Sequence, residues 1–143
     1  MSATEVDTIV IGAGQAGIAT SEHLSANGIE HVVFERDRIA ESWRTQRWDS
    51  LVTNGPAWHD RFPALDFKGH SGEAFVPKDA VVSYFEDYVT HIKAPVKCGI
   101  DVTHVTRNTT CGGFDVTTTT GPYHAQHIAV SYTHLTLPTT VSV

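Results

Sequence analysis

The fold of this chain is decided by the segment Val6-Asp-Thr-Ile-Val-Ile-Gly-Ala-Gly-Gln-Ala-Gly17. Its first half is a short apolar run, rich in β-branched residues, that stops at a glycine, as buried parallel strands do. Residues 15–27 have a composition that suits a helix, and Gly28 stands where a C-terminal cap belongs. Residues 30–35, with His31-Val-Val-Phe34 inside them, predict a second strand. The first 35 residues therefore predict one β-α-β unit.

The second half of this segment fits the pattern GxGxxG, in which each glycine has a physical role. Gly12 permits the tight turn, Gly14 lets the backbone approach a pyrophosphate, and Gly17 allows the helix to pack closely on the strand. The free N–H groups and the positive end of the helix dipole, near Gln15 and Ala16, are expected to hold the phosphates. The strand before the loop and the helix after it favour dinucleotide binding over a simple turn.

An acidic residue ends the second predicted strand and completes the pattern. Glu35 lies 18 residues after Gly17. Its carboxylate can accept a hydrogen bond from a ribose 2′-hydroxyl, and it would repel a 2′-phosphate. The first nucleotide site is therefore predicted for FAD or NAD and not for NADP. A strand-helix turn without any ligand is the alternative.

The rest of the chain is uneven in pattern. Residues 36–76 show no sustained period, and they hold all three tryptophans, so they are expected to form a functional loop. A helix is predicted over 78–92 and a buried strand over 96–98. Three short strands follow at 101–107, 114–120 and 123–130, with turns at 108–113 and 121–122, which predicts a β-meander.

Composition excludes several classes of function. The net charge of −6 disfavours nucleic acid as a partner, because such proteins need a basic face. No apolar run is long enough to cross a membrane and no secretory signal is visible, so a cytoplasmic protein is expected. Cys98 and Cys111 are isolated thiols. His124 and His127 are three apart on a predicted strand and point to opposite faces, so no metal site is predicted.

Several motifs, in order and at similar spacing, resemble the class B flavin-containing monooxygenases from about residue 5 to 129. They are Gly12-Ala-Gly-Gln-Ala-Gly17, Glu35-Arg36, Ser42-Trp43, Ser50-Leu-Val-Thr-Asn54, and Phe75-Val-Pro-Lys followed by Tyr84-Phe-Glu-Asp-Tyr88. The resemblance implies an α/β, Rossmann-like FAD-binding fold of three layers. A parallel sheet would carry helices on one face and the three-stranded meander on the other, in truncated form.

The same resemblance implies a chemistry. In that family FAD is reduced by NADPH and reacts with O₂ to give a C4a-hydroperoxide, which oxygenates a small organic substrate. By position, the FAD pyrophosphate would lie on Gly12, Gly14, Gln15, Ala16 and Gly17. Glu35 would hold the adenosine ribose, with Arg36 beside it as a further cofactor-binding residue.

The remaining candidate residues follow from the same carry-over. Ser42 and Trp43 would line the FAD, and backbone near Val102 would approach the adenine. Thr53 and Asn54 would lie beside the isoalloxazine and the nicotinamide. Asn54 is the predicted catalytic residue, because an amide donates and accepts hydrogen bonds without titrating. A plain Asn-Gly-Pro turn at 54–56 is the alternative.

Two other readings of the whole chain stay open. One is an FAD-dependent NAD(P)H oxidoreductase or reductase without oxygenation, although residues 40–51 lack the cysteine pair of the disulfide reductases. The other is an inactive FAD-binding fragment. Residues 130–139 resemble a translated sequencing adapter, so residues 1–129 are expected to be the FAD-binding domain and 130–143 a non-native tail. The NADPH site is expected to lie largely outside this chain, which alone should be inactive.

Overall fold

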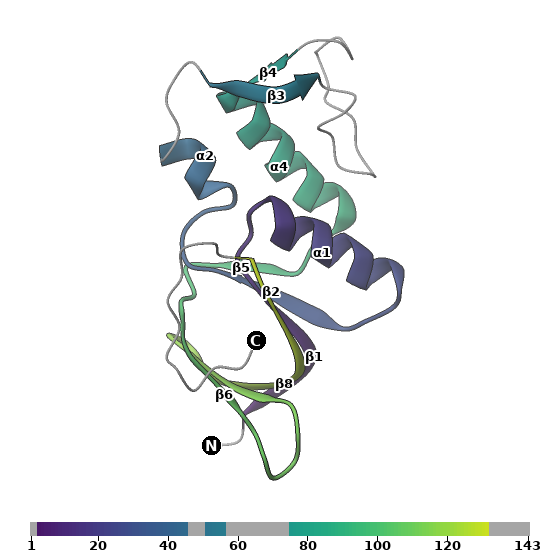
Figure 1. The fold of residues 1–143 in the computed structure, drawn as a ribbon, viewed down its shortest axis with the longest axis vertical. Helices are drawn as coiled ribbons and strands as arrows, with labels where there is room; N and C mark the ends of the chain where they lie inside the picture. Colours follow the sequence, from purple (N-terminus) through teal and green to yellow (C-terminus); the bar gives the residue numbers. More distant parts are fainter. Residues whose placement is uncertain (1–2, 46–50, 57–74, 132–143) are drawn as a thin grey trace. The chain divides into compact units, whose positions relative to one another are not determined.

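The computed structural model of the chain describes residues 3–45, 51–56 and 75–131 (Figure 1). The chain divides into two compact units. Residues 1–38 and 94–143 form one, called here the sheet unit. Residues 39–93 form the other, called here the second unit.

The sheet unit is built on six strands in the order β5-β2-β1-β8-β7-β6. They are β1 (Thr4–Ile11), β2 (His31–Glu35), β5 (Val96–Cys98), β6 (Val102–Arg107), β7 (Phe114–Thr118) and β8 (Gly121–Val130). The four strands β5, β2, β1 and β8 run parallel. The strands β6, β7 and β8 form an antiparallel meander. The predicted Rossmann-like α/β fold is therefore confirmed.

The strand β8 belongs to both parts of this sheet. Its first residues pair with β7, from Phe114↔Ala125 to Thr118↔Gly121. Its longer stretch pairs with β1, from Thr4↔Tyr123 to Ile11↔Val130. The meander is thus continuous with the parallel strands, and Figure 1 shows it curling away from the side of the sheet that carries α1.

Two layers of side chains lie on the two faces of the parallel strands. One face meets the meander, in a core that includes Ile9, Ile11, Val32, Phe34, Val102, Val105, Val116 and Ala125. The other face meets α1 (Gln15–Ala26), whose buried residues are Gly17, Ile18 and Ser21. Because successive side chains of a strand alternate in direction, β2 supplies both layers. Helix, parallel strands and meander make the three predicted layers.

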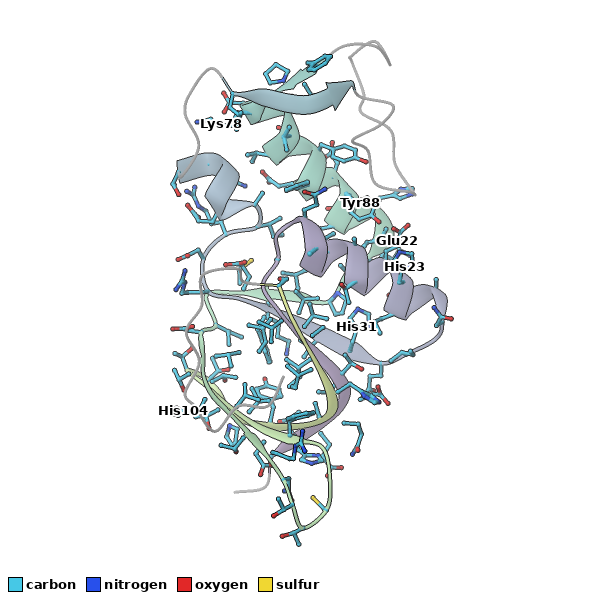
Figure 2. All side chains as sticks on the ribbon, viewed as in Figure 1. Glu22, His23, His31, Lys78, Tyr88 and His104 are labelled. Carbon is cyan, nitrogen blue, oxygen red and sulfur yellow. The ribbon has the colours of Figure 1, made fainter. Side chains whose placement is uncertain are left out.

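The buried ring of His31 marks the contact between β2 and α1 (Figure 2). Its Nε2 lies 2.7 Å from Oγ of Ser21, and its Nδ1 lies 2.9 Å from the carbonyl oxygen of Ile29. A carbonyl can only accept, so Nδ1 carries the proton and Nε2 accepts from the Ser21 hydroxyl. Both ring nitrogens of this buried histidine are thereby satisfied.

One predicted turn is shifted. The turn expected at 121–122 lies at Thr119 and Thr120, and β8 already begins at Gly121. The cause is the Thr118 hydroxyl, which accepts from the N–H of Thr120 at 3.1 Å and donates to the carbonyl of Gly121 at 2.8 Å. This side chain closes the turn earlier than the Gly-Pro pair predicts.

The second unit contains more regular structure than its sequence predicts. It holds α2 (Glu41–Thr45), β3 (Val52–Pro56), β4 (Phe75–Pro77) and α4 (Lys78–Ile92). The strands β3 and β4 pair antiparallel, and α4 has the predicted bounds. Tyr84 and Tyr88 stack along α4 with their ring centroids 6.3 Å apart. In the part of the chain that the structure describes, no helix is both long and apolar enough to cross a membrane.

Candidate functional site

The glycine loop between β1 and α1 starts with a turn that requires glycine. Gly12 has a φ of 106°, a value that side-chain-bearing residues rarely adopt. Its N–H donates to the carbonyl of Phe34 at 2.8 Å, so the loop leaves the sheet directly beside the end of β2. The structure thus gives Gly12 the tight-turn geometry that the motif predicts.

Gly17 lies where α1 crosses this turn. A Cβ built on Gly17 would overlap the carbonyl oxygen of Gly12 and would lie 3.1 Å from Oγ of Ser131. Only a hydrogen fits between the helix and the loop at this point. The predicted close packing of helix on strand is therefore present at Gly17.

The N-terminus of α1 is open. Gly14 occupies the N-cap position, with φ −89° and ψ −164°, and makes no side-chain capping hydrogen bond. A Cβ built on Gly14 would have nothing within 4 Å, and the neighbouring Gln15 and Ala16 are exposed. The first N–H groups of a helix have no partner within the helix. Open space and unused donors at a positive helix end fit a pyrophosphate group.

Glu35 ends β2 directly beside this loop. Its side chain is only 6% exposed. One carboxylate oxygen, Oε1, accepts from the N–H of Ala13 at 2.9 Å, and Oε2 accepts from the N–H of Asp37 at 2.8 Å. A carboxylate has about four acceptor positions, so it can still receive a ribose hydroxyl. The residue lies at the sheet edge where the motif predicts it.

Ser131 is a neighbour of the loop that the sequence does not indicate. Its N–H donates to the carbonyl of Ile11 at 3.0 Å. Its Oγ lies 2.9 Å from the carbonyl oxygen of Ile11 and 3.1 Å from that of Gly12. Because this contact joins residues 119 positions apart in the chain, no local pattern could have revealed it.

The other predicted site residues are distributed over both units. Arg36 is exposed, and its Nε donates to the carboxylate of Asp37 at 3.3 Å. Val102 buries its side chain in the core, two residues after Ile100, whose N–H donates to the carbonyl of Glu35 at 3.1 Å. The backbone near Val102 is thus connected to the end of β2.

Four predicted residues lie in the second unit. Ser42 and Trp43 belong to α2, and Thr53 and Asn54 belong to β3. Their side chains lie outside the described part of the structure. The backbone of 54–56 is extended, so the plain turn considered for Asn54 is not what the structure contains.

The two histidines of β8 differ in surroundings. His124 is buried, with Nε2 at 2.9 Å from the carbonyl oxygen of Gly112 and 3.7 Å from Sγ of Cys111, whereas His127 is exposed. Within residues 3–45, 51–56 and 75–131, no three histidine, cysteine or acidic side chains come together as metal ligands. His124 instead fixes the hairpin between β6 and β7.

Known proteins match this chain in sequence. A model of the pyridine nucleotide-disulphide oxidoreductase family matches residues 9–143. An uncharacterized CzcO-like oxidoreductase of Geobacillus kaustophilus (strain HTA426) is 35% identical over 127 residues, which are 88% of this chain and 35% of that protein. A probable indole-3-pyruvate monooxygenase of Arabidopsis thaliana, YUCCA1, is 32% identical over 111 residues, which are 77% of this chain and 27% of that protein.

The fold is also found in solved structures. The flavin-containing monooxygenase from Stenotrophomonas maltophilia superposes with a TM-score of 0.79 at 23% identity, over 90% of this chain and 38% of that one. The chain spans only 35% and 27% of the lengths of the two curated relatives named above.

Proposed function

The chain belongs to the pyridine nucleotide-disulphide oxidoreductase family, and from that membership we propose that it is the N-terminal, FAD-binding part of an NADPH-using flavin monooxygenase. The resemblance of its motifs to flavin-containing monooxygenases is confirmed by the relatives and solved structures that it matches. The observation that carries the proposal is the loop itself. Gly12 and Gly17 bring α1 onto the turn, while Gly14 and Glu35 leave room and acceptors for a dinucleotide.

The FAD fits the residues as follows. The pyrophosphate would lie on the backbone of Gly12, Gly14, Gln15, Ala16 and Gly17, and the N–H groups offered to it at the positive end of α1 would begin at Gly14. Glu35 would accept hydrogen bonds from the adenosine ribose, with Arg36 at the exposed edge of the site. These residues would bind and orient FAD, which is what protein groups supply to a flavin.

Further contacts to FAD follow the family resemblance. Ser42, Trp43 and Thr53 would line the cofactor, and the backbone near Val102 would approach the adenine. Bound FAD would supply the redox chemistry: with two electrons from NADPH, one oxygen atom of O₂ would end in a small organic substrate and the other in water. Asn54 would hold the oxygen-derived group by donating and accepting hydrogen bonds through its neutral amide.

A reductase that uses NAD(P)H without oxygenating a substrate is the second candidate. The family's own description, which names disulphide oxidoreductases, favours it. Cys98 lies in β5 and Cys111 lies in the turn between β6 and β7, and both are exposed. Residues 40–51 contain no cysteine, so a redox-active cysteine pair at that position is absent.

One experiment separates these candidates. We would isolate the gene from source DNA, extend it beyond residue 129, and assay the longer protein for NADPH oxidation, O₂ uptake and H₂O₂ release. A monooxygenase consumes O₂ and incorporates one of its oxygen atoms into the product. A reductase passes the electrons of NADPH to another acceptor and needs no O₂. In the longer protein, Asn54→Ala should raise the share of NADPH that ends as H₂O₂. An unchanged share would remove Asn54 from the chemistry.

Sequencing the same DNA also tests whether residues 130–143 belong to the natural protein. We propose that residues 130–143 are not native. Val130 ends β8 and Ser131 contacts the loop, while residues 132–143 lie outside the described residues. A reading frame that continues differently after Ala129 supports the proposal, and a frame that encodes 130–143 followed by a stop codon contradicts it. The 143-residue chain should bind FAD weakly and show no NADPH turnover.

A further inference from the structure

We propose that Glu35 is a positioning residue for the glycine loop as well as a ligand of the ribose, an inference that rests on the proposed FAD site. The carboxylate joins three parts of the chain. It belongs to β2, its Oε1 holds the N–H of Ala13 in the loop, and its Oε2 holds the N–H of Asp37 after the strand. The loop is therefore fastened to the end of β2 before any nucleotide is present.

Burial gives this contact its strength. Glu35 is 6% exposed and Ala13 is fully buried. A buried carboxylate is costly unless hydrogen-bond donors surround it, and hydrogen bonds to a charged group are the strong ones. The two N–H groups stabilise the buried charge of Glu35, and Glu35 in turn satisfies the buried N–H of Ala13. Losing the carboxylate would leave that N–H without an acceptor.

The contact also divides the N–H groups of the loop between two tasks. The N–H of Gly12 is bonded to Phe34, and that of Ala13 is bonded to Glu35. The donors that remain for a phosphate begin at Gly14, at the open end of α1. Glu35 thereby sets where along the loop an anion is held, in addition to what it binds at the ribose.

The first test uses the full 143-residue chain without nucleotide, and it measures amide hydrogen exchange. In the native chain the N–H groups of Ala13 and Asp37 should be protected. In Glu35→Gln the side chain offers one acceptor and turns an NH₂ group toward the other donor. At least one of the two amides should then exchange about tenfold faster. Unchanged protection of both would overturn the proposal.

Two controls belong to this measurement. The amides of Val10 and Val33, inside β1 and β2, should exchange as in the native chain and so report an intact fold. Glu30→Gln removes the same charge from an exposed position at the other end of β2 and should alter neither Ala13 nor Asp37. If Glu35→Gln does not fold, Glu35→Asp keeps the charge, shortens the reach by one methylene, and should expose the same two amides.

The second test compares ADP with 2′-deoxy-ADP, by titration of the native chain and of Glu35→Gln. If Glu35 acts only through the ribose 2′-hydroxyl, the substitution leaves the affinity for 2′-deoxy-ADP unchanged, and our inference fails. If Glu35 positions the loop, the affinity for 2′-deoxy-ADP falls as well, by about tenfold. The lost negative charge cannot cause this fall, since its removal favours binding of an anion.

The outcomes separate this inference from the proposed function. Failure of the native chain to bind ADP and FAD would contradict the proposed cofactor site. The exchange rates of Ala13 and Asp37 would still decide whether Glu35 fastens the loop.

Discussion

The carbonyl oxygen of Gly12 occupies the space that a side chain on Gly17 would need. Gly12 begins the loop and Gly17 lies in the first turn of α1, so the helix rests on the turn at Gly12. The fit is a backbone contact, so no rearrangement of a flexible side chain can relieve a larger residue there. The helix and the turn must move apart if Gly17 is replaced.

Replacing Gly17 therefore tests the packing of α1. Gly17→Ala should destabilise the chain by about 1–3 kcal/mol, because the new methyl group displaces the carbonyl of Gly12. Urea unfolding followed by circular dichroism measures this loss. It should also abolish FAD binding, seen as loss of flavin fluorescence quenching. A native midpoint of unfolding would mean that α1 does not lie on the loop.

Gly14→Ala is the matched control, for which we expect a loss of FAD affinity without a loss of stability. Gly14→Ala adds a methyl group where nothing lies within 4 Å, at a φ of −89° that alanine adopts freely. Stability should stay the same or rise by about 0.4–1 kcal/mol, because alanine restricts the unfolded chain. FAD affinity should nevertheless fall, since the methyl group enters the space proposed for the pyrophosphate. Undiminished affinity would place the pyrophosphate elsewhere.

Ser21→Ala tests the buried hydrogen bond between α1 and β2. The substitution removes the donor that satisfies Nε2 of His31, and the ring nitrogen stays buried without a partner. A loss of about 1–3 kcal/mol in the free energy of unfolding is expected. Ser25→Ala, on the exposed side of the same helix, should change it by less than about 0.5 kcal/mol. Equal effects of the two substitutions would contradict the hydrogen bond.

His124→Ala tests the hairpin between β6 and β7. It removes a buried ring and the hydrogen bond to the carbonyl of Gly112, so a loss of about 1–2 kcal/mol is expected from thermal or urea unfolding. His127→Ala is the control, because that ring is exposed on the same strand. A larger effect at His127 than at His124 would show that the register of β8 is wrong.

The sequence predicts the sheet unit well because its signals are local. The apolar run of β1, the glycine loop and the helix that ends before Gly28 follow one another without a gap. Gly28 has a φ of 69°, as a helix-ending glycine should. The helix over 78–92 is found with the predicted bounds, since its apolar residues repeat at helical spacing.

In the second unit, local sequence patterns predict α4 but not α2, β3 and β4. The helix α2 has five residues, and β3 and β4 have five and three, so each is too short to carry a periodic pattern. The pairing of Val52 with Pro77 joins residues that are 25 positions apart in the chain. Such pairing depends on tertiary contacts, which propensities cannot anticipate.

In the candidate site, too, some positions follow from the local sequence and others do not. The positions of Gly12, Gly14, Gly17 and Glu35 follow from the motif, because every step of that motif lies within one β-α-β unit. The contacts of Ser131 with Ile11 and Gly12 do not, since they join opposite ends of the described chain. The roles of Ser42, Trp43, Thr53 and Asn54 stay predictions.

The pairing of β8 with β1 has a consequence for how the protein is made. The ribosome releases Ile9 about 120 residues before its partner Ile128, so the centre of the sheet is the last part to close. Until then the nascent chain presents β1 with an unpaired edge and an apolar face, which invites association with other chains. Cofactor binding is thus expected to be a late event that follows completion of the sheet.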